Sequence, residues 1–322
     1  MKFRPLIVPT AAALLTGLFA TGCGVELEGE EGELSFRYLG TDLVSGASSG
    51  TLATGARIDV ELRTPGSDQS LPVREAVSED SEVLEVLEVL ERRFTLSAVA
   101  AGEARITAEA LGADDEVISD SVSIAVADVD SVRLGVRCPD PVFVTDSRAQ
   151  FSYRMYDASG SKLTGYGRFD VAVEPDTGGS VNEGIDQIEV LEIHTGSEAG
   201  SYELQSTVDD ETFAFELVAP GDILFADIRD DDAEEVEHSV AVGSEAAVAL
   251  FHLETGDATV CGPATAAIDL SVDSPEICEA EYRFVGDLHL LFVNGLSEGS
   301  CEVELQIPDT DISETFSVEV TP

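Results

Sequence analysis

Hydrophobic and polar residues alternate along much of the chain, and the alternation recurs about every hundred residues. Three glycines, Gly102, Gly200 and Gly299, open the clearest stretches and lie 98 and 99 residues apart. The positions two, four and six residues after these glycines are Ala104, Ile106 and Ala108, then Tyr202, Leu204 and Ser206, then Cys301, Val303 and Leu305, the second set being the least apolar. A period of two predicts strands with one buried face.

Each of these strands is followed by a polar turn and a second alternating strand, at residues 121–126, 212–218 and 315–320. An earlier strand recurs at a similar spacing, at residues 57–62, 150–155 and 247–251. Short strands with frequent turn signals, repeated as a unit of about 100 residues, predict an all-β fold of three tandem antiparallel sandwiches. The predicted domains cover residues 34–127, 128–219 and 220–322.

Residues 81–90 do not follow the simple alternation. Their apolar residues come in pairs every three residues, which also suits an amphipathic helix. The repeat argues against a helix, because the counterpart at residues 274–293 is rich in β-forming residues and is broken by Pro275 and Gly286. We therefore expect strands here.

The first unit resembles bacterial Ig-like domains of the group 2 type. In that family a Ser-x-Asp stretch precedes a strand and a Gly-x-Ala-x-Ile strand ends the unit, as at residues 78–83 and 102–106. The third unit repeats the pattern at residues 271–275 and 299–303, whereas the middle unit departs from it at residues 174–179. The resemblance implies Ig-like sandwiches and a role in adhesion or scaffolding.

The chain opens with a pattern typical of a secretory signal peptide, predicted over residues 1–22. Lys2 and Arg4 precede an apolar run that ends before small residues. A permanent span is the weaker interpretation, because a membrane-spanning helix needs about 20 apolar residues and this shorter run is followed by acidic residues. Residues 20–23, Ala-Thr-Gly-Cys, resemble the lipobox of bacterial lipoproteins, although that family usually has Leu where Ala20 stands.

This second resemblance implies cleavage before Cys23 and a lipid anchor on that cysteine, held in the membrane by its acyl chains. Gly24 follows where Asp would signal inner-membrane retention, so the resemblance implies a cell-envelope location at the outer membrane. The alternative is ordinary cleavage near Gly22, which leaves Cys23 as a free thiol. Residues 23–33 are predicted to be an acidic tether.

Acidic residues far outnumber basic ones. Residues 23–322 hold 64 acidic and 15 basic side chains, and Lys162 is their only lysine. Nucleic acid and anionic lipid surfaces are therefore excluded as partners, because binding them requires a basic face. The 43% of hydrophobic residues argues for folded cores rather than disorder. The excess negative charges repel one another, and salt screens this repulsion, which suggests a saline habitat.

Four further cysteines, an even number in an exported chain, favour disulfides. Cys301 lies on the inward face of its strand, and the favoured partner is Cys278 in the same unit. Closing that loop of about 24 residues contributes about 3 to 4 kcal/mol on the chain-entropy model. Cys261 is a rival partner, and Cys138 is either free or bridges two units. No Cys-x-x-Cys or paired-His spacing supports zinc.

Two Gly-x-Ser-x-Gly stretches, centred on Ser48 and Ser297, match the serine-hydrolase elbow. The second falls in a predicted turn between two strands and the first in a loop rich in small residues. The four histidines show no paired spacing, so we expect no enzyme and no catalytic residues. Acidic clusters at residues 114–116, 209–211 and 230–235 could supply oxygens to calcium, but none has the Asp-x-Asp-x-Asp-Gly loop. We expect no cofactor, with calcium left open as an alternative.

The function predicted from these features is a lipid-anchored envelope stalk that has a structural or adhesion-like role. Its partners would be the membrane, through the lipid, and a protein or glycan that the sequence does not identify. The alternative is an accessory subunit of an envelope complex that faces the periplasm. Fold alone does not decide between them.

Overall fold

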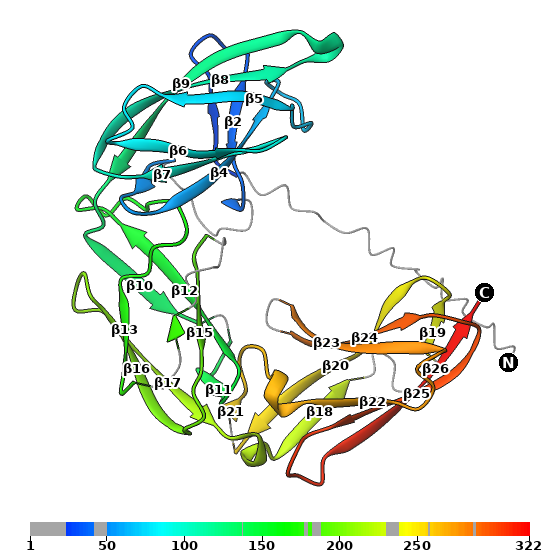
Figure 1. Ribbon diagram of the computed structural model, residues 1–322. Helices are drawn as coiled ribbons and strands as arrows, with labels where there is room; N and C mark the ends of the chain where they lie inside the picture. Colours follow the sequence, from blue (N-terminus) through cyan, green and yellow to red (C-terminus); the bar gives the residue numbers. More distant parts are fainter. Residues whose placement is uncertain are drawn as a thin grey trace, which may run out of the picture.

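The protein is built almost entirely of β-strands, arranged as three sandwiches that follow one another along a curved arc (Figure 1). The computed structural model describes residues 24–41, 50–136, 138–176, 180–181, 188–229, 238–256, 258–285 and 288–322. The predicted signal peptide and Cys23 lie outside these residues. Each sandwich consists of two sheets whose inner faces form a core.

The strands occur in chain order within each sandwich. Sandwich 1 holds β1 (Glu26–Glu28), β2 (Ser35–Tyr38), β3 (Leu52–Ala53), β4 (Arg57–Arg63), β5 (Val73–Ser78), β6 (Leu84–Val89), β7 (Phe94–Ala98), β8 (Gly102–Leu111) and β9 (Val117–Ala127). Sandwich 2 holds β10 (Ser131–Gly135), β11 (Val142–Val144), β12 (Arg148–Tyr156), β13 (Val171–Glu174), β14 (Ser180–Val181), β15 (Val190–His194), β16 (Gly200–Ser206) and β17 (Thr212–Val218). Sandwich 3 holds β18 (Phe225–Arg229), β19 (His238–Ala241), β20 (Glu245–Thr255), β21 (Ala258–Thr259), β22 (Asp269–Val272), β23 (Cys278–Val285), β24 (Leu288–Gly295), β25 (Gly299–Gln306) and β26 (Ser313–Thr321). Short 3₁₀ helices cover Ala113–Asp115, Pro220–Asp222 and Thr265–Ala267.

All three sandwiches share one topology. Their first sheets run β2-β4-β7-β6, β10-β12-β15-β14 and β18-β20-β24-β23, with β1 added beside β2 and β21 beside β20. Their second sheets run β3-β9-β8-β5, β11-β17-β16-β13 and β19-β26-β25-β22. The first strand of each second sheet pairs with the last strand in parallel, and the other pairs are antiparallel. This arrangement is that of an Ig-like sandwich, so the predicted all-β, Ig-like fold class is confirmed.

The predicted alternation is visible in the burial of the hairpin strands. Ile106 on β8 and Val303 on β25 are fully buried, and exposed or half-buried residues stand on either side of each. The least apolar copy, β16, buries Tyr202 and Leu204 but leaves Ser206 half-buried. Around this strand the core of sandwich 2 is filled by aromatic rings, with Phe143 and Phe151 at 5.0 Å between centroids.

Residues 81–90 form a turn followed by β6, as predicted. The unusual apolar pattern has a local cause: the pairing of β6 with β7 shifts register between Val86 and Glu88, so that one residue bulges. Because β6 is also an edge strand, Leu87 and Val89 remain exposed.

The N-terminal segment differs from its prediction as a tether. Within residues 23–33, Glu26–Glu28 forms β1, which pairs antiparallel with β2. Val25 and Leu27 pack against the core of sandwich 1. The described part of the segment is therefore part of sandwich 1 and not a tether. Its acidic composition suggested a solvated linker, but its alternate apolar side chains pack against the core.

A buried carboxylate holds this segment in place. Asp120 on β9 accepts N–H bonds from Glu31, Glu33, Leu34 and Ser121 at 2.7 to 3.0 Å. Burial raises the pKa of the Asp120 carboxyl, but the four N–H donors outweigh it, so that the pKa lies below its ordinary value. Asp120 therefore stays ionised near pH 7 and ties the N-terminal turn to β9 in the second sheet of sandwich 1.

Candidate functional site

The most distinctive features of the molecule are the two junctions between sandwiches. Each sandwich carries the same turn after the first strand of its second sheet, between β3 and β4, β11 and β12, and β19 and β20, at residues 53–56, 144–147 and 241–244. The third residue of each turn has a positive φ, at Gly55 (+84°), Asp146 (+52°) and Gly243 (+76°). The N–H of the second residue donates to the last strand of the same sandwich at 2.8 to 2.9 Å. The turn is thus a rigid, repeated element at one end of each sandwich.

At the first junction, the segment between β12 and β13 adds to the turn of sandwich 1 as a short strand would. The N–H of Ala53 donates to the carbonyl of Thr164 at 3.0 Å, and the N–H of Thr164 donates to the carbonyl of Thr51 at 2.9 Å. Arg57 and Tyr166 exchange two further N–H bonds of 2.9 Å each. Backbone groups of two domains therefore satisfy one another.

Side chains and one glycine complete this contact. A Cβ on Gly165, which has φ +133°, would lie 2.6 Å from the Cβ of Ala56, so only glycine allows this approach. Tyr166 belongs to the core of sandwich 1, whereas Ala56 belongs to that of sandwich 2. The guanidinium of Arg168 also donates to the carbonyl of Thr54. Each core therefore includes a residue of the neighbouring sandwich.

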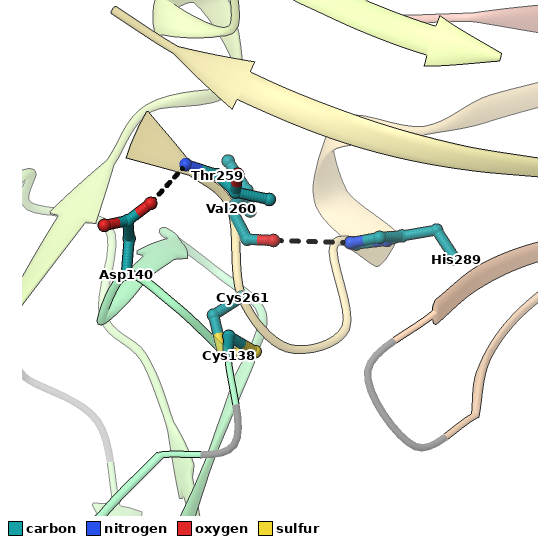
Figure 2. The surroundings of a disulfide bond; sticks show 6 residues. All are labelled: Cys138, Asp140, Thr259, Val260, Cys261 and His289. Carbon is teal, nitrogen blue, oxygen red and sulfur yellow. Dashed lines mark hydrogen bonds between the residues drawn. A yellow bond between two sulfur atoms is a disulfide. The ribbon is translucent and has the colours of Figure 1, made fainter. Parts of the chain in front are cut away.

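The second junction repeats this docking and adds a covalent bond (Figure 2). The N–H of Cys261 donates to the carbonyl of Val142 at 2.6 Å, as Thr164 does to Thr51 in the first junction. The N–H of Thr259 donates to the Asp140 carboxylate at 3.0 Å. Cys261 forms a disulfide with Cys138, which lies between β10 and β11. Of the alternatives open for these cysteines, the bridge between units is the one in the structure.

A glycine again permits the close contact. A Cβ on Gly262, with φ +81°, would lie 3.0 Å from the Phe143 ring and 3.2 Å from the carbonyl of Arg148. Ser147 donates its hydroxyl to the carbonyl of Pro263. Gly262 thus has the same place in this junction as Gly165 in the first. Pro263 stands where the first junction has Tyr166, and it has no backbone N–H to donate. The disulfide at Cys261 is next to Gly262 in the chain.

Buried polar side chains support the docked segment from within sandwich 3. His289 is 1% exposed and lies beside the Phe251 ring. Its Nδ1 lies 2.9 Å from the Tyr282 hydroxyl, which accepts the N–H of Ala264 at 2.9 Å, and its Nε2 lies 3.5 Å from the Val260 carbonyl. Burial lowers the pKa of His289 to about 4, so the ring is neutral near pH 7.

The opposite end of sandwich 1 is not covered by another sandwich and is hollowed. A cavity of about 710 Å³ there is lined by Thr64, residues 67–72, Arg92 and residues 111–113. These belong to three loops, and the Arg92 guanidinium donates to the carbonyl of Ser70 at 3.4 Å. The lining mixes hydroxyl, amide and charged side chains with apolar residues such as Leu71 and Leu111, which suits a ligand or a protein loop that has both polar and apolar groups. In the other two sandwiches the segment that corresponds to residues 64–72 is the one that docks.

The structure also places the residues that the sequence singled out. Cys278 and Cys301, the favoured pair, form a disulfide between β23 and β25, with 6.4 Å between their Cα atoms. Ser297 lies in the turn between β24 and β25, where its hydroxyl donates to the carbonyl of Glu276 at 2.7 Å. Cys23 and Ser48 lie outside the described residues.

Among the described residues, no group of three or more His, Cys, Asp or Glu side chains is placed to hold a metal ion. No helix within the same ranges is long and apolar enough to cross a membrane. Of the acidic clusters, residues 230–235 lie outside the described ranges.

The docking segments were not recognised in the sequence. Their signal is a difference in length: the segment between β4 and β5 of sandwich 1 covers residues 64–72, whereas the corresponding segment between β12 and β13 of sandwich 2 covers residues 157–170. The longer copies in sandwiches 2 and 3 carry Gly165 and Gly262, each after a residue whose N–H bonds across the junction.

Comparisons with known proteins add no family. No protein-family model matches the chain, and no curated protein matches it. Among solved structures, the Escherichia coli adhesin FdeC has a TM-score of 0.25 at 10% identity, with 87% of this chain and 100% of that chain covered. Domains 5–6 of the S-layer protein SbsC have a TM-score of 0.27 at 18% identity, with 61% and 99% covered, and the titin fragment I67–I69 has 0.18 at 12%, with 84% and 94% covered. Likenesses this distant carry no inference about function.

Proposed function

We propose that this protein is an exported, lipid-anchored component of the cell envelope that acts as a stiff, curved spacer with a structural or adhesion-like role. The observation that carries the proposal is the construction of the two junctions. Only residues 128–130 separate β9 from β10, and both junctions are held by backbone bonds across the boundary. A spacer needs such fixed geometry, whereas domains on flexible linkers move independently by default.

Stiffness can be measured on the purified chain. We expect small-angle scattering to give the profile of a single bent particle, with the same maximum dimension at low and high salt. The matched control replaces residues 128–130 by a Gly-Ser linker of the same length. Because this variant keeps the docking segments, its profile should match that of the wild type. A profile that requires several independent domain orientations would contradict the spacer.

The proposed anchor rests on the sequence before the described residues. If Cys23 carries lipid, only Gly24 and Val25 separate it from β1, so the membrane would lie beside sandwich 1. Labelling growing cells with a radioactive fatty acid tests this directly. We expect label on the wild-type chain and none on Cys23→Ser, and an unlabelled wild-type chain would refute the anchor.

The cavity on sandwich 1 is the proposed contact surface for a protein or glycan partner. It lies at the end of the sandwich away from Val25, whose carbonyl accepts the N–H of Tyr38. A photo-crosslinker at Asp68, which is fully exposed at the cavity rim, should capture a partner on intact cells. The same group at exposed Glu298 on sandwich 3 is the control. Equal capture from both positions would refute a specific contact at the cavity.

The side of the membrane is a separate question that protease treatment of intact cells answers. We expect the chain to be cleaved if the spacer stands on the cell surface. Full protection, with cleavage after the outer membrane is opened, would contradict the surface location and place the spacer in the periplasm.

A further inference from the structure

We propose that the Cys138–Cys261 disulfide is a covalent load path, which carries tension past most of sandwich 2 and keeps that sandwich folded when the chain is pulled by its ends. The inference goes beyond the proposed anchor and contact surface, which both lie on sandwich 1, and concerns a load applied between sandwich 1 and the C-terminal sandwich 3. Its physical basis is the position of the two cysteines in the topology.

Without the disulfide, tension would pass through every strand in turn. It would enter sandwich 2 through β10 and β11 and leave through β17. Strands β11 and β17 are parallel neighbours, with Val142 opposite Glu216 and Val144 opposite Val218. A pull on opposite ends of such a pair loads its hydrogen bonds together, so this pair would resist until it failed at once and released the whole sandwich.

With the disulfide, tension leaves the backbone at Cys138, before β11 begins. It re-enters at Cys261, directly after β21 of sandwich 3. The bypassed stretch between the two cysteines holds seven strands of sandwich 2, β11 to β17, and the first four of sandwich 3. The second disulfide, between Cys278 and Cys301, removes another stretch in the same way. The covalent route then consists of residues 24–138, 261–278 and 301–322.

The contacts around the bridge are arranged to support it. The Thr259 bond to Asp140 lies near the disulfide (Figure 2). The N–H of Cys261 itself donates to the carbonyl of Val142. The first junction has the corresponding backbone bond from Thr164 to Thr51 but no disulfide, since Thr164 stands where the second junction has Cys261. Tension should therefore load β10, open the first junction and unfold sandwich 1, while strands β11 to β17 of sandwich 2 stay inside the covalent loop.

Single-molecule stretching of the mature chain tests the proposal. Handles are joined enzymatically to peptide tags at the two ends, with Cys23→Ser to keep that thiol out of the chemistry. A stretched residue spans about 3.5 Å, so the 123-residue separation of Cys138 and Cys261 hides about 430 Å of contour length, and the 23-residue separation of Cys278 and Cys301 hides about 80 Å.

We expect non-reduced wild-type chains to show the unfolding of sandwich 1 but no event that releases the length of sandwich 2. The double variant Cys138→Ser, Cys261→Ser should gain about 430 Å, partly through such an event. The matched control, Cys278→Ser with Cys301→Ser, should gain only about 80 Å and keep sandwich 2 protected.

Two results would overturn the load path. One is a non-reduced wild-type chain that extends as far as the Cys138→Ser, Cys261→Ser variant. The other is the release of sandwich 2 in the matched control. Should the first variant fold poorly, wild-type chains stretched before and after reduction give the same comparison in one molecule. The test uses purified protein, so its failure is distinguishable from a failure of the proposed envelope location.

Discussion

Asp120 should determine whether the N-terminus is attached to sandwich 1, and Asp120→Ala removes the attachment. The carboxylate accepts four backbone N–H groups, of which those of Leu34 and Ser121 are on buried residues. The exposed amides of Glu31 and Glu33 can bond to water instead. A hydrogen bond to a charged group contributes about 1.5 to 3 kcal/mol, so losing the two buried ones should cost about 3 to 6 kcal/mol.

The sign of the pH dependence follows from the lowered pKa. The folded chain binds this proton less readily than the unfolded chain, whose Asp has a pKa of about 3.9. The contribution of Asp120 is therefore complete above about pH 4 and is lost as the pH falls through the lower folded pKa. Asp120→Ala should show a weaker loss of stability in this acid range than the wild type.

Hydrogen exchange read by mass spectrometry is the assay, because it reports residues 26–38 separately from the rest of the chain. We expect fast exchange there in Asp120→Ala, and an intermediate rate in Asp120→Asn, which keeps one acceptor oxygen. Glu116→Ala, an exposed carboxylate before the same strand, should leave exchange unchanged. Protection of residues 26–38 in Asp120→Ala equal to that of the wild type would refute the role of the carboxylate.

Three further predictions concern the cores and junctions. Replacing Cys278 and Cys301 by alanine should lower the free energy of unfolding of sandwich 3 by about 3 to 4 kcal/mol, because the opened loop gains entropy in the unfolded chain. Denaturant titration measures this change, and a decrease of less than about 1 kcal/mol would contradict the prediction. Gly165→Val should separate the first two sandwiches and raise the maximum dimension in small-angle scattering, because its Cβ would meet Ala56. Gly160→Ala, with open space around it, should leave the maximum dimension unchanged. Identical profiles for both variants would refute the steric argument. Because the buried ring of His289 stays neutral in the folded chain, sandwich 3 should lose stability as the pH falls from about 6.5 to about 4, by about 3 kcal/mol in total. A His289→Phe chain with the same dependence of stability on pH would show that another group titrates.

The repeat in the sequence was sufficient to predict the three sandwiches, because one buried face imposes a period of two on every hairpin strand. Gly102 and Gly299 open strands at the expected positions. The N-terminal segment could not be predicted in the same way. Its two apolar side chains, Val25 and Leu27, are too few to make a pattern, and the acceptor that holds the turn, Asp120, lies about ninety residues later in the chain.

The two disulfides differ in the same way, because one joins cysteines within a unit and the other joins cysteines of two units. Cys278 and Cys301 belong to one unit, and the parity of their strands makes their pairing predictable. Cys138 and Cys261 belong to different sandwiches, and their proximity depends on how Gly262 docks against Phe143. Such contacts between domains leave no periodic signal, so the junctions had to be found in the structure.

Strand β1 also sets an order of events during export. The turn that follows it donates backbone N–H groups to Asp120, so the N-terminal segment can be held only after β9 is in place. If the chain is exported with its N-terminus first, as proposed, this segment stays unattached until β9 has followed it. Folding of sandwich 1 would then end the period in which a lipid could be added to Cys23.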